Sequence, residues 1–275
     1  MIAILGDIHG NLPALEAVLE NMPVVSQVWA VGDYVTGVPF PGEVIDRLQN
    51  LPVPVYSVLG NHDESLLNKR GGVYGKQFGI FGWVEEVLKP HHWAFLENLP
   101  KTLVIDNLPL NRNALLFHGT PESTTGTIIT RQDAEDVMAA HDFAYLAGGH
   151  RHKIIRIRKE NQYVIVAGSV GISLDGSGGQ ASYALLDEKT GKAAFQIIDY
   201  DVDSAIAAID KSPITELAPG ISYCVKKELE TGKPYMMSFV KFAFELAEKQ
   251  LGYRPDEVPS ELWDEAGKMW DKSPL

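Results

Sequence analysis

Cysteine is almost absent from this sequence, since Cys224 is the only one among 275 residues. One thiol cannot close an intrachain disulfide, so nothing points to an oxidising compartment, and we interpret Cys224 as a packing residue. The first residues also lack the basic segment, the long apolar stretch and the cleavage site of a secretory signal peptide. We therefore expect a protein of the cytoplasm.

Long apolar runs are scarce as well. The longest apolar helical pattern, around residues 236–251, contains four charged side chains, which is too many for a membrane-spanning helix. We expect a soluble protein that has no membrane partner.

Positively charged residues are also few compared with negatively charged ones. The chain has 24 Lys and Arg residues against 36 Asp and Glu residues, and its net charge is −12. This balance argues against loose electrostatic binding to DNA, RNA or anionic lipid as the main activity, so we expect no extended nucleic-acid partner. A nuclease would ordinarily need a basic track for its polymer, and a small substrate is the preferred interpretation.

What is present begins with a repeated local pattern. Three apolar runs, at residues 2–5, 29–31 and 55–59, each end in a polar tip that contains glycine, and a helical pattern follows. This alternation predicts a mostly parallel α/β sheet, whose functional groups lie beyond the carboxyl ends of its strands. Further strands, which would form a second sheet, are expected at residues 103–105, 114–117, 145–147, 163–166, 183–186 and 194–198.

The pattern becomes helical after about residue 200, and no polar strand tip occurs beyond that point. We predict a catalytic domain over residues 1–200 and a helical C-terminal appendage over residues 201–275. These helices would pack on the core or join subunits of a homo-oligomer. Residues 64–82 are rich in glycine and aromatic side chains and are expected to form an active-site loop, followed by a helix over residues 84–99.

Five polar clusters occupy the expected strand tips, and five of the eight histidines fall within them. Carboxylate, amide and imidazole groups together suit Mn, Fe, Ni or Zn better than Ca or Mg alone. A lone histidine at a strand tip is more often a surface residue than a ligand, so the joint pattern carries the prediction. The clusters are Asp7-x-His9, Gly32-Asp33, Gly60-Asn61-His62-Asp63, His118-Gly119 and Gly149-His150-Arg151-His152.

In this order, the five clusters resemble the signature of the calcineurin-like metallophosphoesterases. The resemblance extends over residues 1–187 and is strongest toward the small bacterial and archaeal phosphodiesterase branch. It implies the metallo-dependent phosphatase fold, a four-layer α-β-β-α sandwich of two mixed sheets, which agrees with the α/β pattern. It also implies a metal-dependent hydrolase that acts on phosphoric ester bonds.

The resemblance further implies a binuclear metal centre in which Asp33 bridges the cations. Two cations about 3.5 to 4 Å apart need a shared anionic ligand to offset their repulsion. Mn²⁺ is the first expectation, with Fe, Zn or Ni as alternatives, and a metal-bridging hydroxide would be the nucleophile. The implied ligands are Asp7, His9, Asp33 and His152 for one metal, and Asp33, Asn61, His118 and His150 for the other.

Four more residues are candidates for catalysis or substrate binding. His62 stands outside the implied ligand set and is expected to act as a general acid or cationic stabiliser. Asp63 is expected to orient and charge His62. Arg70 lies at nearly the offset where protein Ser/Thr phosphatases place a phosphate-binding arginine, although a solvated loop arginine explains it equally well. Arg151 replaces the usual threonine between two implied ligands and adds a cation near the site.

The Gly-Asp segment at residues 32–37 contains no arginine, unlike that of protein Ser/Thr phosphatases. Protein phosphatase activity is therefore in doubt. A phosphomonoester dianion usually needs such arginines, so a small phosphodiester or a nucleotide is the expected substrate, with phosphomonoesters as the alternative. A non-catalytic protein-binding scaffold is the alternative from another class, because some members of this fold have lost catalytic residues. This chain retains every implied ligand.

Overall fold

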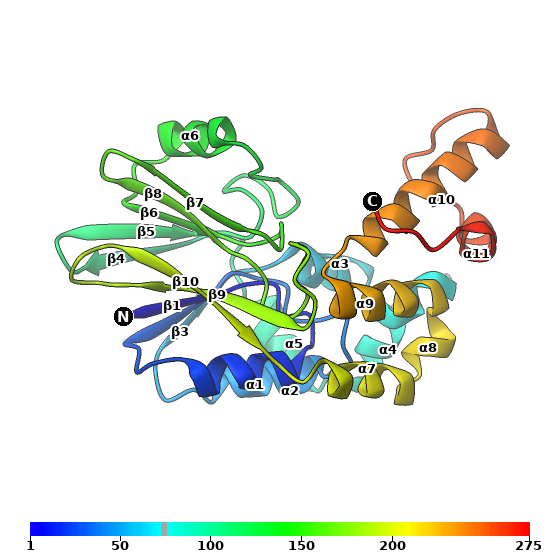
Figure 1. Ribbon diagram of the computed structural model, residues 1–275, viewed down its shortest axis with the longest axis horizontal. Coiled ribbons are helices and arrows are strands. Elements are labelled where there is room, and N and C mark those ends of the chain that lie inside the picture. Colours follow the sequence, from blue (N-terminus) through cyan, green and yellow to red (C-terminus); the bar gives the residue numbers. More distant parts are fainter. Residues whose placement is uncertain (73–75) are drawn as a thin grey trace.

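The computed structural model describes residues 1–72 and 76–275. Two five-stranded mixed sheets pack face to face (Figure 1). Figure 1 shows helices α1, α2 and α5 outside one sheet and helix α6 outside the other. The four-layer α/β sandwich expected from the sequence is confirmed.

The first sheet has the strand order β10-β9-β1-β2-β3, in which β1, β2 and β3 run parallel. Side chains alternate between its two faces, so Ile4 of β1 enters the core between the sheets while Leu5 packs toward the outer helices. Both faces of the sheet are buried at β1, which explains why residues 2–5 are all apolar. The elements are β1 (Ile2–Leu5), β2 (Gln27–Ala30), β3 (Val55–Ser57), β9 (Gln180–Leu186), β10 (Ala193–Asp199), α1 (Leu12–Asn21), α2 (Pro41–Gln49) and α5 (Pro90–Glu97).

The second sheet has the order β4-β5-β6-β8-β7, with parallel strands β5, β6 and β8 at its centre. Strand β7 was not expected from the sequence. Strand β7 is an edge strand with the sequence IIRIRK, in which apolar and basic residues alternate. The elements are β4 (Leu103–Leu108), β5 (Arg112–Leu116), β6 (Tyr145–Gly148), β7 (Ile154–Lys159), β8 (Gln162–Ala167) and α6 (Arg131–Ala140).

Residues 64–82 differ from the expected active-site loop. Helix α3 (Asn61–Lys69) begins inside the third polar cluster, and the chain continues through η1 (Lys76–Phe78) into α4 (Gly79–Val87). Residues 73–75 lie outside the described residues. The helix expected over residues 84–99 is divided, because Pro90 starts α5 at the first helical position, where its missing N–H costs nothing.

The C-terminal helices lie together beyond one end of the sandwich (Figure 1). Ala205 of α7 and Val225 of α9 share a buried cluster with Ile172 of the catalytic half, whereas α10 and α11 form a second apolar core with Cys224 of α9 around Phe239. The domain boundary at residue 200 stays a prediction. Among the described residues, no helix is both long and apolar enough to span a membrane. The helices are α7 (Val202–Lys211), α8 (Ile214–Leu217), α9 (Pro219–Thr231), α10 (Tyr235–Leu251) and α11 (Ser260–Met269).

Candidate metal centre

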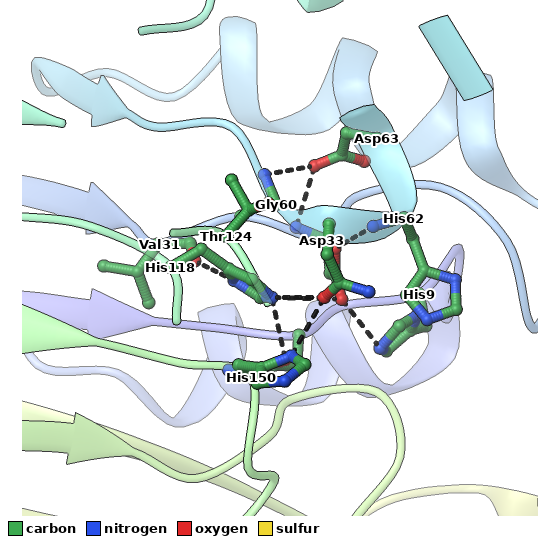
Figure 2. A network of polar contacts seen from close by, with 12 residues as sticks. His9, Val31, Asp33, Gly60, His62, Asp63, His118, Thr124 and His150 are labelled. Atoms are coloured by element: carbon green, nitrogen blue, oxygen red, sulfur yellow. Dashed lines mark hydrogen bonds and ion pairs between the residues drawn. The ribbon is translucent and has the colours of Figure 1, made fainter. Parts of the chain in front are cut away.

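The parallel strands bring the polar clusters to one common edge. In both sheets the parallel strands end on the same side, and all of them except β8 are followed by a ligand-type side chain. All seven predicted ligands lie there in one continuous set of contacts, part of which Figure 2 shows. Directly beyond the strand ends stand Asp7 after β1, Asp33 after β2, Asn61 after β3, His118 after β5 and His150 after β6.

The first half of the cluster contains Asp7, His9 and His152. His9 Nε2 lies 3.1 Å from His152 Nε2, which in turn lies 3.3 Å from Asp7 Oδ1. Asp7 is fully buried and His9 is nearly so. Three ligand atoms of these residues lie within 4.8 Å of one another, close enough to share one cation.

The second half contains Asn61, His118 and His150. The Oδ1 atom of Asn61 lies 2.9 Å from both His118 Nε2 and His150 Nδ1. The loop of His150 is also tied to the first half, because its backbone N–H donates to the Asp7 carboxylate at 3.0 Å. The two halves are therefore one structural unit.

Asp33 stands between the halves. Its Oδ2 atom lies 3.6 Å from His9 Nε2 in the first half and 3.2 Å from His118 Nε2 in the second. Its other oxygen, Oδ1, accepts the backbone N–H of His62 at 2.8 Å. Among the predicted ligands, Asp33 thus has the position that a shared ligand would need.

Three of the histidines are held by backbone carbonyls, so their ring orientation is fixed. The Nδ1 atoms of His9, His118 and His152 lie 3.2, 2.7 and 2.5 Å from the carbonyl oxygens of Thr36, Val31 and Ile172, respectively. A carbonyl oxygen can only accept, so each Nδ1 must carry the proton. In the neutral form of each ring, Nε2 then points a lone pair into the cluster, as metal-bound histidines do when a carbonyl supports the ring.

The backbone is strained at the same place. Of the eleven non-glycine residues with positive φ in the described ranges, six belong to the site, with φ between 52° and 70°. Such conformations cost about 1–3 kcal/mol each and persist where the surroundings enforce them, most often at functional sites. The six are Asp7, His9, Asp33, Thr36, His150 and His152.

The buried carboxylates attract positive charge. Burial opposes protonation of His118, but Asp33 and Asp7 outweigh it and raise the pKa of His118 to about 10. Burial likewise opposes protonation of His152, yet the carboxylate of Asp7 raises its pKa. By contrast, burial lowers the pKa of His9 to about 3. Without metal, the site therefore holds protons where cations would otherwise balance its carboxylates.

His62 lies beside the cluster and is oriented by a residue that the sequence analysis did not single out. Its Nδ1 atom lies 2.9 Å from Thr36 Oγ1, and its ring meets that of His9 edge to face (Figure 2). Thr36 also supplies the carbonyl that holds His9. Its positive φ, unusual for a β-branched residue, is a structural sign of this double role.

Asp63 has a different task from the expected one. Its carboxylate accepts the backbone N–H groups of Asp33, Tyr34 and Gly60 at 2.8 to 3.0 Å and that of Val35 at 3.3 Å. The prediction that Asp63 orients His62 is wrong, because these backbone groups occupy its oxygens and Thr36 contacts His62 instead. Asp63 fixes the Asp33 loop against the start of α3.

The two arginine candidates lie in different places. Arg70 pairs with Glu97 at 2.6 Å, stacks on Trp93 at 3.9 Å from the ring centroid, and lines a separate surface cavity. The structure does not bring Arg70 to the cluster. Arg151 lines a cavity of about 730 Å³ that also opens onto His62 and His152.

A further Asp–His group lies away from the cluster, where Asp46 accepts from His91 and His92. The Nδ1 atom of His92 accepts the Lys89 N–H at 3.1 Å, so its Nε2 must carry the proton that Asp46 receives. A cation at Nε2 would force that proton onto Nδ1, against the Lys89 N–H. We interpret this group as a hydrogen-bonded link between α2 and α5.

The sequence comparison decides the family. The calcineurin-like phosphoesterase superfamily domain matches residues 1–191. The chain belongs to this superfamily. The metallophosphoesterase of Sphaerobacter thermophilus, a solved structure, has a TM-score of 0.66 at 26% identity over 79% of this chain and 97% of its own.

Two sequence relatives add detail to the superfamily assignment. An uncharacterised protein of Methanocaldococcus jannaschii is 29% identical over 78% of this chain and 94% of its own length. A symmetrical bis(5'-nucleosyl)-tetraphosphatase of Baumannia cicadellinicola is 38% identical, but only over 72 residues, or 25% of either chain. The resemblance noted from the five clusters is thus confirmed at the level of the superfamily.

The residues present fit the metal dependence of a calcineurin-like phosphoesterase. Ring nitrogens with lone pairs turned inward, an amide oxygen and two buried carboxylates form a mixed donor set suited to transition metals. Sequence reasoning missed Thr36 and the carbonyls behind the histidines. The carbonyls carry no residue signal, because any residue type can supply a backbone oxygen.

Proposed function

We propose that the chain is a binuclear-metal phosphodiesterase that hydrolyses a small phosphodiester. The observation that carries this proposal is the pair of imidazole nitrogens, His9 Nε2 and His152 Nε2, which face each other at 3.1 Å while carbonyls hold both opposite ring nitrogens. Two lone pairs at this distance repel unless a positive charge lies between them. A buried site built to hold positive charge suits an anionic phosphate.

Within this proposal, the ligand set is the one that the family resemblance implies, with Asp33 shared. When bound, two such cations supply charge that holds a phosphate and lower the pKa of a water to about 7. We propose Mn²⁺ first, with Fe, Zn and Ni as alternatives. The two sets are Asp7, His9, Asp33 and His152, and Asp33, Asn61, His118 and His150.

His62 would deliver a proton to the departing alcohol. Burial lowers the pKa of His62, so its imidazolium is a stronger acid, although fewer of the rings carry the proton near pH 7. The Thr36 hydroxyl can both donate and accept, so it can stay bonded to Nδ1 before and after the ring gives up its proton. Thr36 is a positioning residue in this scheme.

A diester is favoured over a monoester because few arginines reach the site. A monoester dianion is usually held by arginine forks in addition to metals. Arg70 is bound to Glu97, so Arg151 is the arginine that lines the cavity. A diester monoanion needs less positive charge.

The test is a comparison of bis-p-nitrophenyl phosphate with p-nitrophenyl phosphate at saturating Mn²⁺, with metal analysis of the purified protein. We expect a higher kcat/KM for the diester. A clear monoester preference that Arg151→Ala abolishes would show that Arg151 supplies a clamp and that the substrate class is wrong. Protein purified without metal, and inactive after Mn²⁺ addition, would instead favour a non-catalytic scaffold.

The similarity to a tetraphosphatase segment makes a dinucleotide polyphosphate the second candidate substrate. Bis(5'-adenosyl) tetraphosphate therefore belongs in the same assay. A kcat/KM for this compound far above that for the diester would favour cleavage of a phosphoanhydride.

A further inference from the structure

The cavity beside the metal centre has two chemically different ends. Its volume is about 730 Å³, and one end is formed by His9, His62 and the histidines around Arg151. The other end is formed by α4 and by the C-terminal helices α9 and α10. The C-terminal helices thus build a wall of the same cavity that contains the candidate catalytic groups.

The far wall is almost entirely hydrocarbon. Apart from the carboxyl of Glu228, its side chains are aliphatic, aromatic or thioether groups, none of which offers a strong hydrogen-bond donor or acceptor. A nucleobase or sugar placed here would lose hydrogen bonds to water without replacing them. A hydrocarbon group would instead gain by leaving water, by about two- to fourfold in affinity for each methylene. The wall includes Ile80, Phe81, Ile221, Val225, Met236 and Val240.

One oxygen of a buried carboxyl among these residues is already engaged. Glu228 of α9 also lines the cavity, but its Oε1 atom accepts the backbone N–H of Met236 at 2.7 Å. This bond satisfies a free N–H at the start of α10 and ties α10 to α9. Glu228 therefore holds the apolar wall together.

The cations of the cavity lie at the catalytic end. Arg151 and Lys153 flank His152 and line the cavity, and neither has an ion-pair partner among the described residues. With the metal ligands beside them, they make this end suited to a phosphate. The cavity as a whole therefore matches an amphiphile, with a phosphate at one end and an apolar group at the other.

We propose that this cavity binds the hydrocarbon group of an alkyl phosphate ester and that α9 and α10 select for it. The inference rests on the proposed function, because the phosphate end is the candidate metal centre. It assigns the C-terminal helices a role in substrate choice, and it predicts that esters of alkyl groups are better substrates than esters of nucleosides.

The test uses diesters that share one leaving group. Methyl, butyl and hexyl p-nitrophenyl phosphate are compared with thymidine 5'-(p-nitrophenyl phosphate) on the Mn²⁺-loaded protein. We expect kcat/KM to rise about two- to fourfold for each added methylene and the thymidine ester to fall below the hexyl ester. Equal rates along the alkyl series, or a preference for thymidine, would overturn the inference.

Two matched variants locate the effect. Met237 lines the cavity and is 49% exposed, whereas Met269 at the end of α11 is 57% exposed and lies outside it. Met237→Glu should lower the hexyl-to-methyl ratio of kcat/KM at least tenfold, and Met269→Glu should leave it at the wild-type value. Equal ratios in both variants and the wild type would contradict a wall at α10.

A binding measurement separates this inference from the proposed function. Alkylphosphonates cannot be hydrolysed as esters, so calorimetry with methyl-, butyl- and hexylphosphonate reports the cavity without turnover. Affinity that rises with chain length, with a negative heat-capacity change, supports the cavity assignment even if every ester is inert. Turnover of esters together with chain-independent phosphonate binding would retain the phosphodiesterase and reject the apolar pocket.

Discussion

His9 and His152 come from loops 143 positions apart in the chain, and their Nε2 atoms meet at 3.1 Å with the opposite ring nitrogens held by backbone carbonyls. Neither ring can turn its Nε2 away without losing that support. The loops after β1 and β6 are therefore set in advance around a positive charge, which is a proton in the metal-free protein and a cation in the proposed enzyme.

Metal binding should release protons. The pKa of His118, raised to about 10, leaves this ring protonated near pH 7 without metal, and the raised pKa of His152 increases the protonated fraction of that ring. A protonated ring must lose its proton to act as a ligand. We expect between one and two protons to be released, and metal affinity to rise with pH with a matching slope. Calorimetric titration of Mn²⁺ in two buffers of different ionisation enthalpy measures the number. Identical heats in the two buffers would show that the site is already deprotonated.

Asp33→Ala should cost more metal than any other single ligand change, because Asp33 contacts histidines in both halves of the cluster. Asp46→Ala is a matched control, since Asp46 also accepts from two histidines but lies on the outer helices. Metal analysis after dialysis should show loss from Asp33→Ala and wild-type content in Asp46→Ala. Two retained metals and normal turnover in Asp33→Ala would contradict the assignment of Asp33 as the shared metal ligand.

The site was largely predictable because parallel strands place their carboxyl ends together. Polar residues that follow apolar runs, such as Asp33 and His118, could therefore be grouped without coordinates. The role of Asp63 was readable too, since an acidic residue three positions after Gly60 is a sign of a helix start. The glycine and aromatic content of residues 64–82 suggested a loop instead, although α3 continues to Lys69.

The support of the histidines and the apolar wall of the cavity were not predictable, for two physical reasons. The carbonyl oxygen of Val31 holds the ring of His118. Because every residue type has a backbone carbonyl, the sequence does not show which residue gives this support. The apolar wall made by Met236 and Val225 looks in the sequence like ordinary helix packing, because the amphipathic pattern shows which side is apolar but not what fills the space opposite.

His62→Ala should keep its metals and lower kcat by roughly 10²-fold or more, the usual contribution of a positioned acid. The ring lies outside the proposed ligand set although it is close to His9 and Asp33. Metal analysis and turnover of the same preparation check both parts. Loss of metal from this variant would mean that His62 is a ligand.

Thr36 offers a finer test of the same proposal. Thr36→Ser and Thr36→Ala both remove the β-branch, but only serine keeps the hydroxyl that contacts His62 Nδ1 at 2.9 Å. We expect Thr36→Ser to stay near wild type, and Thr36→Ala to lower kcat with an altered pH profile and unchanged metal content. Equal kcat and equal pH profiles in the two variants would show that the hydroxyl does not position His62.

Glu228→Gln should change the pH dependence of stability. Burial raises the pKa of Glu228 to about 7 from its usual 4.5, although backbone donors and His152 oppose the shift. Below pH 4.5 the carboxyl is protonated in both states, so it costs nothing. Between pH 4.5 and 7, Glu228 is ionised in the unfolded chain but keeps its proton in the folded chain. The free energy of unfolding therefore falls as pH rises through this range.

Glutamine does not ionise, yet it keeps the oxygen that accepts the Met236 N–H. The stability of Glu228→Gln relative to wild type should therefore increase from pH 4.5 to 7 and then level off, by about 1.4 kcal/mol for each unit of raised pKa. Urea unfolding across this range measures the difference. Glu230→Gln, whose side chain is 40% exposed and pairs with Lys227, should show no such trend. A constant difference between Glu228→Gln and wild type would mean that Glu228 ionises in the folded wall as readily as in the unfolded chain.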